Sequence, residues 1–245
     1  MHIDVAFSPR DIMPASSGIA IVVDVIRATT SIVTLFEQGL KQLFVAPTLT
    51  TGRNFARSYG YLLCGEEHGA RPEGFDYGNS PLAFSHERFD GQTAVLCTTN
   101  GTVALRTASV FHTVLAGCLN NARAACQRAL ELAHGQPITI VCSASYGHFA
   151  FDDAWTAGRL VHYLKTASPE ESTLTDAARA ALALIQAESD AHRALHSSRS
   201  ARALQPLHLL DDVDFAAREN CSTIVPELTH NGSQPAHPLM LTPDS

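Results

Sequence analysis

Short apolar runs rich in β-branched residues alternate with helix-like segments along most of this chain. Such runs, bounded by acidic residues, Gly or Pro, are typical of buried strands. Strands that alternate with helices favour an α/β fold with a mainly parallel sheet covered on both faces. We predict strands over Ile3–Phe7, Ile19–Val25, Leu43–Ala46, Tyr61–Cys64, Thr93–Cys97, Thr113–Ala116, Ile138–Cys142 and Thr223–Pro226.

The segments between these strands have helical periodicity and recognisable ends. A helix over Ala28–Gln38 stops at Gly39, and Thr48 can cap a second that runs to about Tyr59. All of these elements are assigned to one unit over residues 1–229, which is a single domain or two closely joined lobes. Within it, residues from about 168 to 210 are predicted to form a helical subregion. Residues 230–245 are expected to form a flexible tail. Further helices are predicted over Asn120–Leu132, Asp152–Thr166 and Leu174–Leu195.

Charge and cysteine usage exclude several classes. The net charge is −7 and the 17 Lys and Arg form no basic run, so nucleic-acid binding has little electrostatic support. We expect no membrane partner and a cytoplasmic location, because no secretory signal or apolar span is evident. None of the six cysteines forms a CxxC pair, and Cys97 and Cys142 end apolar runs where a reduced thiol acts as a small hydrophobe. An anionic ligand would have to be held by local devices such as helix N-termini, single arginines or a cation.

The predicted strands lead into polar clusters at their carboxyl ends, the edge where open α/β sheets bind ligands. The first cluster places Asp24 in an otherwise apolar strand, which is costly unless the carboxylate is paired or binds a cation. Arg27 and the N–H groups at the following helix start could grip an anionic oxygen, with Thr29 near the cap. A simple Asp24–Arg27 ion pair is an equally good interpretation of these residues.

Two more clusters contain acids. Glu66 and its neighbour Glu67 follow the strand Tyr61–Cys64 and suit a hard divalent cation, although a solvated acidic turn is the better interpretation of an isolated Glu-Glu. The segment 73–81 has glycines for tight bends and ends in a helix start, so it can deliver Asp76 and Asn79 in fixed orientation.

The last clusters combine small polar residues with helix starts. Thr98-Thr99-Asn100-Gly101-Thr102 can form a nest of oxyanion donors, although it lacks the GK[ST] signature and a capped turn explains it equally well. The segment after Ile138–Cys142 contains His148, Asp152 and Asp153, and acids are favoured at a helix start in any case. Asn120 follows another strand and is expected at the same edge.

In this order the clusters resemble the 2-phosphosulfolactate phosphatase family. The resemblance implies a three-layer α/β/α fold and a Mg²⁺-dependent phosphatase domain that converts 2-phosphosulfolactate to sulfolactate and phosphate in coenzyme M biosynthesis. It extends from the first strand to about Pro226. The matching residues are Asp24-Val25-Ile26-Arg27-Ala28-Thr29, Gly65-Glu66, Gly74-Phe75-Asp76-Tyr77-Gly78-Asn79-Ser80-Pro81, Thr98-Thr99-Asn100-Gly101-Thr102 and Asp152-Asp153 with Ala157-Gly158.

Two positions depart from the family pattern and put the exact substrate in doubt. Glu67 replaces a cation, and Asp152 stands where Glu is usual. The nucleophile is left open between water and a carboxylate, although the DxDx[TV] run of aspartyl-phosphate enzymes is absent.

Combining residues and resemblance gives a hypothesis for the site. The metal ligands are Asp24, Glu66, Asp76 and Asp153. Catalytic roles fall to Asp24, to Arg27 as an anion ligand, to Asn79 as the group that orients the substrate, and to Asp152 or His148 as proton donor. Substrate contacts are assigned to Arg27, Thr29, Thr99, Asn100, Gly101, Thr102 and Asn120.

A rival hypothesis is a non-catalytic binder of sulfonated or phosphorylated metabolites. Such a binder needs the arginine and the N–H nests but no cluster of carboxylates. The partner is a small anionic phosphoester in either case, and the sequence leaves a homodimer open.

Overall fold

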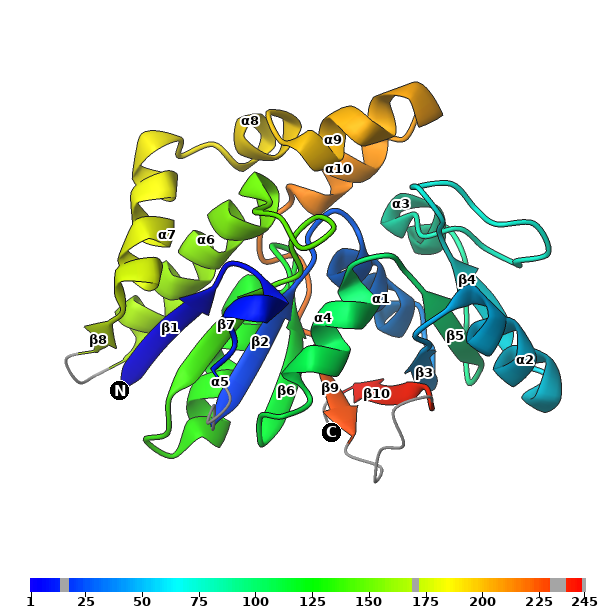
Figure 1. The fold of residues 1–245 in the computed structure, drawn as a ribbon, viewed down its shortest axis with the longest axis horizontal. Helices are drawn as coiled ribbons and strands as arrows, with labels where there is room; N and C mark the ends of the chain where they lie inside the picture. The colour runs from blue at the N-terminus through cyan, green and yellow to red at the C-terminus, as the bar shows by residue number, and fades with distance from the viewer. Residues whose placement is uncertain (14–17, 169–171, 230–236, 244–245) are drawn as a thin grey trace.

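A computed structural model of the protein describes residues 1–13, 18–168, 172–229 and 237–243. It contains one mixed sheet with helices packed around it (Figure 1). The strands are β1 (His2–Ala6), β2 (Ile19–Val23), β3 (Gln42–Val45), β4 (Leu62–Gly65), β5 (Thr93–Cys97), β6 (Thr113–Gly117), β7 (Ile138–Cys142), β8 (Thr173–Leu174), β9 (Pro226–Thr229) and β10 (Leu239–Pro243).

The helices connect successive strands or lie over one end of the sheet. No helix among the described residues is long and apolar enough to cross a membrane. The helices are α1 (Ala28–Glu37), α2 (Leu49–Tyr59), α3 (Pro81–Ser85), α4 (Gly101–Ala108), α5 (Ala122–Ala133), α6 (Phe151–Ala167), α7 (Asp176–Ala187), α8 (Ala191–His196), α9 (Arg199–Leu204) and α10 (Leu210–Ala216), with 3-10 turns η1 (Pro9–Asp11) and η2 (Gln205–Leu207).

The sheet has the order β4-β5-β3-β10-β9-β6-β2-β7-β1-β8. Pairing is parallel within β4-β5-β3 and within β6-β2-β7-β1-β8. The antiparallel strands β9 and β10 lie between these two parallel halves and join them. The prediction of a mainly parallel sheet is therefore confirmed.

Alternate residues of β2 point to opposite faces of the sheet and into two different cores. Ile19, Ile21 and Val23 belong to a core that includes side chains of α5 and α6, whereas Ala20 and Val22 belong to a core with α1 and α4. Strands buried on both faces explain why these runs are apolar throughout. Two helical layers around one sheet make the three-layer α/β/α fold that the resemblance implied.

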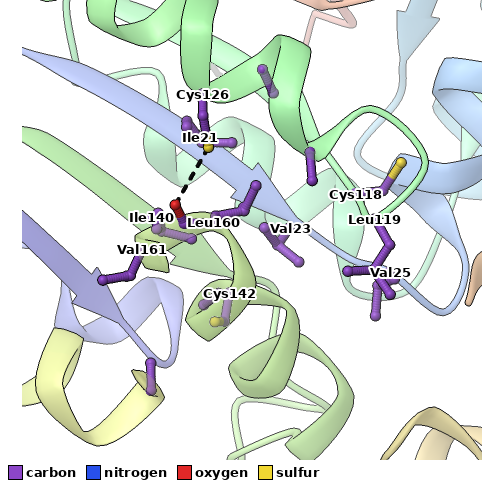
Figure 2. Packing of buried hydrophobic residues seen from close by; sticks show 14 of the residues in the cluster. Ile21, Val23, Val25, Cys118, Leu119, Cys126, Ile140, Cys142, Leu160 and Val161 are labelled. Carbon is purple, nitrogen blue, oxygen red and sulfur yellow. Dashed lines mark hydrogen bonds between the residues drawn. The ribbon is translucent and has the colours of Figure 1, made fainter. Parts of the chain in front are cut away.

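Figure 2 shows the first of these cores, in which Cys126 of α5 meets α6. Its thiol donates to the Leu160 carbonyl (3.4 Å) beside Ile21 and Ile140. Cys142 is buried in the same core, and burial raises the pKa of its thiol well above the usual value. This cysteine acts as a small hydrophobe, as predicted, and so does buried Cys97.

The single long helix predicted over Leu174–Leu195 is wrong. The structure divides this region into β8, α7 and α8. Thr175 begins α7 by accepting a hydrogen bond from the Ala178 N–H, and Asp190 begins α8 by accepting one from the Arg193 N–H. The extended backbone at Glu188 and at the N-cap Asp190 separates the two helices, and Thr175 moves the start of the first one beyond Leu174.

The C-terminal segments also differ from expectation. Leu239–Pro243 form β10, in register with β3 and β9, so this part of the expected flexible tail is a strand inside the sheet; residues 230–236 and 244–245 lie outside the described residues. The predicted strand Thr223–Pro226 is shifted to Pro226–Thr229, where β10 supplies a pairing partner. The preceding chain is held instead by Asn121, whose amide donates to the Ile224 carbonyl (2.8 Å).

Helices α8, α9 and α10 (residues 191–216) form a cap across the carboxyl ends of the strands (Figure 1). Helix α7, just before the cap, packs closely on α6. A Cβ on Gly158 would lie 2.3 Å from the Ala181 carbonyl oxygen, so glycine is required for this approach. The cap therefore rests on a firmly packed pair of helices.

Candidate active site

A cavity of about 240 Å³ lies between the carboxyl ends of the strands and the cap. It is small and polar, which suits a ligand of a few carbon atoms with charged groups. Most of the lining comes from the loops after β2, β4, β5 and β7, and the roof from α9. The lining residues are Asp24, Ile26, Arg27, Glu66, His68, Gly69, Asn79, Thr98, Thr99, Asn100, Ser145, Tyr146, Ser200, Ala203 and Leu204.

Asp24 stands where β2 gives way to α1. Its Oδ1 accepts a hydrogen bond from the Ala28 N–H (3.2 Å) at the helix start. The main chain of Asp24 is fixed by Thr29, whose Oγ1 accepts from the Asp24 N–H and donates to its carbonyl. Thr29 is thus a positioning residue rather than the substrate ligand that was predicted.

The start of α4 packs directly on Asp24. A Cβ on Gly101 would lie 2.5 Å from the Cβ of Ala28 and 2.8 Å from Asp24 Oδ2, so only glycine allows this close approach. The TTNGT segment therefore reaches the carboxylate although β5 and β2 are not neighbours in the sheet. Thr102 lies behind the lining, where its hydroxyl accepts from the Thr98 N–H (3.2 Å).

Glu66, in the cavity lining after β4, is held by two backbone donors. The Thr99 N–H donates to its Oε1 and the Gly69 N–H to its Oε2, both at 2.7 Å. The segment was predicted to offer its N–H groups to a substrate oxyanion, but the Thr99 N–H instead donates to the Glu66 carboxylate and orients it. Asn100 also makes an internal contact, accepting from the Tyr146 N–H (3.0 Å).

Asp152 and Asp153 lie behind Asp24 in the first turn of α6. Asp153 accepts from the Val25 N–H (3.0 Å), the Ser143 hydroxyl (2.8 Å) and the Ala144 N–H (3.2 Å), and does not line the cavity. It is therefore better assigned to positioning the loops than to metal ligation. Asp152 accepts from the Ser200 hydroxyl of α9 (3.1 Å).

These buried acids are costly to ionise together. Burial, reinforced by the charges of Asp152 and Glu66, raises the pKa of Asp24 to about 7, against the hydrogen bond from Ala28. Burial raises the pKa of Asp152 to about 6, while the bond from Ser200 opposes this shift. Burial, with Asp152 and Asp24 nearby, also raises the pKa of Asp153 well above its ordinary value. A cation placed among the acids would remove this penalty.

The donor set fits a hard divalent cation. Asp24 and Glu66 face the cavity, and the side-chain oxygen of Asn79 is buried at its wall without a hydrogen-bond partner among the described residues. Asp24 and Glu66 are the two carboxylates in the lining. Mg²⁺ is commonly bound through one or two carboxylates and keeps several waters.

Arg27 provides the positive charge of the cavity. One terminal nitrogen donates to Asp212 Oδ2 of α10 (2.8 Å) and the other to the Gly69 carbonyl (2.6 Å). The alternative Asp24–Arg27 pair is therefore wrong, because the arginine pairs with the cap. A guanidinium has five N–H donors, so Arg27 can keep both contacts and still donate to an anion.

Besides Thr29, Gly101, Thr102, Asp152 and Asp153, three further predicted site residues are absent from the cavity lining. The carboxylate of Asp76 accepts from the Leu63 N–H (2.8 Å) and lines a separate hollow beside α2, so it is not a ligand of the same metal. The amide of Asn120 donates to the carbonyls of Phe215 and Arg218, which makes it a structural link to α10. His148 is exposed in a turn and lines no part of the cavity.

Sequence reasoning missed the residues that come from the cap. Asp212 lies in an acidic helix start that is indistinguishable from a solvated one, and Ser200 lies in a short polar run. The histidine at the cavity is His68, whose Nδ1 is 3.2 Å from the Tyr146 hydroxyl. The roles of Asp212 and Ser200 become visible only when α9 and α10 pack over the strand ends.

Comparisons with known proteins agree with the geometry. The sequence profile of the family described as 2-phosphosulpholactate phosphatase matches residues 7–231. A protein of Deinococcus radiodurans named "Probable 2-phosphosulfolactate phosphatase" is 36% identical over 94% of this chain and 96% of its own length. Proteins with the same name from Thermus thermophilus and Thermotoga petrophila are 38% identical (89% and 92% covered) and 32% identical (93% and 96% covered).

Proposed function

Because the chain belongs to the 2-phosphosulfolactate phosphatase family, we propose that it hydrolyses 2-phosphosulfolactate, or a closely related small phosphorylated acid, to the free hydroxy acid and phosphate. The observation that carries the proposal is that two carboxylates, Asp24 and Glu66, and one anchored arginine, Arg27, line the same cavity of about 240 Å³. We further propose that it works in the cytoplasm and depends on Mg²⁺.

Asp24 and Glu66, with the Asn79 oxygen, would hold the ion directly or through water. Bound Mg²⁺ supplies Lewis-acid neutralisation of charge on the phosphoryl oxygens. The hydrogen bonds that fix Glu66 and Asp24 before any ligand arrives keep their oxygens oriented, which lowers the reorganisation needed in the transition state.

Arg27 binds the remaining negative charge of the substrate. Asp212 and the Gly69 carbonyl hold the guanidinium in place, so little side-chain entropy is lost when an oxyanion is bound. The alkoxide that leaves phosphorus needs a proton. We assign this proton to the His68–Tyr146 pair, because both side chains line the cavity whereas His148 does not.

The acids also favour catalysis over the rival binding function. A receptor that only held a sulfonate or phosphate would be weakened by two carboxylates facing its ligand, since like charges repel without an intervening cation. An enzyme that needs a cation at the phosphoryl group has a use for the same residues.

The test is phosphate release from 2-phosphosulfolactate, phosphoglycolate and phospholactate, each with Mg²⁺ and with EDTA. We expect turnover with Mg²⁺, at least a tenfold loss in EDTA, and the highest kcat/KM for 2-phosphosulfolactate. Equal kcat/KM values for the three would refute recognition of the sulfonate. Absence of turnover on all of them, with tight metal-independent binding of sulfolactate, would refute the phosphatase proposal in favour of the binder.

A further inference from the structure

Two imidazoles and one carboxylate converge on the outer side of the cap, away from the residues that line the cavity. His192 and His196 belong to α8 and Asp214 belongs to α10. The Nε2 atoms of the two histidines lie 2.8 Å and 2.6 Å from the same atom, Asp214 Oδ1. Within the described residues, this is the one group of three His, Cys, Asp or Glu side chains whose ligand atoms all lie within 4.8 Å of one another.

The sequence and the packing of the cap both build this convergence. Residues four apart lie on the same side of a helix, so the two rings project together, with centroids 4.2 Å apart and planes at 31°. Helix α10 packs beside α8 and brings Asp214 to both Nε2 atoms. Three ligand atoms from two helices are therefore already gathered before any ion arrives.

Hydrogen bonding alone does not explain the whole arrangement. The His196 ring nitrogen is hydrogen-bonded to Asp214 Oδ1, and the His192 ring nitrogen crowds the same oxygen without such a bond. Both histidines are partly exposed, where a surface ion pair contributes little stability. In a metal site, nitrogen and oxygen ligands lie about 2.0–2.2 Å from the ion and therefore about 3–3.5 Å from each other. Side-chain movements that open the present contacts by roughly half an ångström would reach that geometry.

We propose that His192, His196 and Asp214 bind a divalent transition-metal ion of the Zn²⁺, Co²⁺ and Ni²⁺ class, with water completing the coordination. Imidazole nitrogen selects these ions, whereas Mg²⁺ prefers oxygen. The side chain of His192 is 61% exposed, so solvent and the ion can reach the ligands from outside. The protein thus offers two cation sites of different chemistry, with oxygen ligands in the cavity and two nitrogens on the cap.

An ion at this position would fasten α8 to α10. The same helix α10 carries Asp212, which pairs with Arg27 at the cavity. An ion that binds only the folded protein stabilises it by mass action, so its effect should be visible as an increase in melting temperature. This effect does not depend on the reaction that the cavity performs.

The test uses the full metal-free chain in excess Mg²⁺, which occupies the oxygen ligands of the cavity. Co²⁺ is titrated and followed by its visible d–d absorption, and Zn²⁺ binding is measured by calorimetry and by the shift in melting temperature. The variants are His192→Gln, His196→Gln and Asp214→Asn. His162→Gln, which removes an exposed histidine of α6 outside the group, is the matched control.

We expect one Co²⁺ per chain in the wild type and in His162→Gln, and at least tenfold weaker binding in the three variants of the group. The Zn²⁺-dependent rise in melting temperature should disappear in the same three. Circular dichroism of the metal-free variants establishes that they are folded. Binding of equal affinity and spectrum in His196→Gln, or no binding to the wild type at millimolar Co²⁺, would overturn the proposal.

Discussion

Two sets of buried carboxylates lie around the cavity, which Asp24 lines directly, and they differ in how their charge is balanced. Asp212 enters from the cap and has its own cation, since Arg27 is 2.8 Å away and the Ser80 hydroxyl donates to its other oxygen. Asp24 and Asp152 enter from the strand ends, and burial raises the pKa of both. The first arrangement is complete without a ligand and holds the cap in place. In the second, burial favours the protonated acids, and a bound cation would favour their ionised form.

The substitution with the largest expected effect on activity is Asp24→Asn, which tests whether this carboxylate serves a bound cation. The change removes a negative oxygen from the proposed ion site but keeps the shape of the side chain. We expect kcat/KM to fall about 10³-fold, the scale reported for the loss of one preorganised electrostatic group. Urea denaturation in EDTA should show a folded protein that is at least as stable as the wild type, because a costly buried charge has gone. A loss of both activity and stability would mean that Asp24 is mainly structural.

For Asp212→Ala we expect the opposite effect on stability, which should fall. This change leaves the Arg27 charge buried and unpaired, which costs about 3–5 kcal/mol of unfolding free energy. Urea denaturation should show that loss with or without Mg²⁺, and KM should rise because the arginine is no longer anchored. If the variant kept its stability, the ion pair would not be what holds the cap.

The pH dependence of stability distinguishes the two sets directly. In EDTA, the folded protein retains a proton on Asp24 up to about pH 7, whereas the unfolded chain loses it near the ordinary value of 3.8. Because the folded state binds more protons over this range, stability should fall as the pH rises, by about 2 kcal/mol between pH 5 and pH 7. Mg²⁺ favours the ionised acids and should reduce this slope. Equal slopes in Mg²⁺ and EDTA would contradict the proposed ion site.

The two histidines near the site form a matched pair for a smaller effect. His68→Gln removes a side chain that lines the cavity and contacts the Tyr146 hydroxyl, so we expect about a tenfold lower kcat/KM, within the range of general acid–base effects. His148→Gln changes an exposed residue outside the cavity and should stay within about twofold of the wild type. Steady-state kinetics on the same substrate compares them, and the reverse order would restore His148 as the proton donor.

The smallest effect is expected at Asp76, a carboxylate whose main contact is with the backbone. Asp76→Ala removes the acceptor of the Leu63 N–H and should cost about 1 kcal/mol of unfolding free energy. kcat/KM and Mg²⁺ dependence should be unchanged, since Asp76 lines a different hollow. A marked loss of activity would return Asp76 to the metal site.

The sequence predicted the fold well where local pattern and burial agree. Thr93–Cys97 and Ile138–Cys142 are strands with the predicted bounds, because both consist mainly of apolar and β-branched residues and are buried on two faces. Leu174–Leu195 was mispredicted because the Asp190 N-cap interrupts a continuous apolar periodicity. The strand β10 was missed because its partner β3 lies far away in the sequence, and a short run after prolines carries little local signal.

The site was predicted only in part, for a similar reason. Asp24, Arg27, Glu66 and Asn79 were found because a polar residue at a strand end is conspicuous. Asp76 and Asn120 carry the same local signal but serve the backbone, and nothing in the sequence separates these uses. The contribution of α9 and α10 depends on long-range packing, which periodicity does not encode.

The position of β9 and β10 between the two parallel halves has a consequence for biosynthesis. Every other strand of the sheet is translated before these two, yet they are the ones that join β3 to β6 across the middle. Each half can begin to assemble on the ribosome, but the halves stay unconnected until the hairpin emerges. A nascent chain stalled before residue 226 would expose two unpaired sheet edges, and such edges are where chaperones and aggregation act.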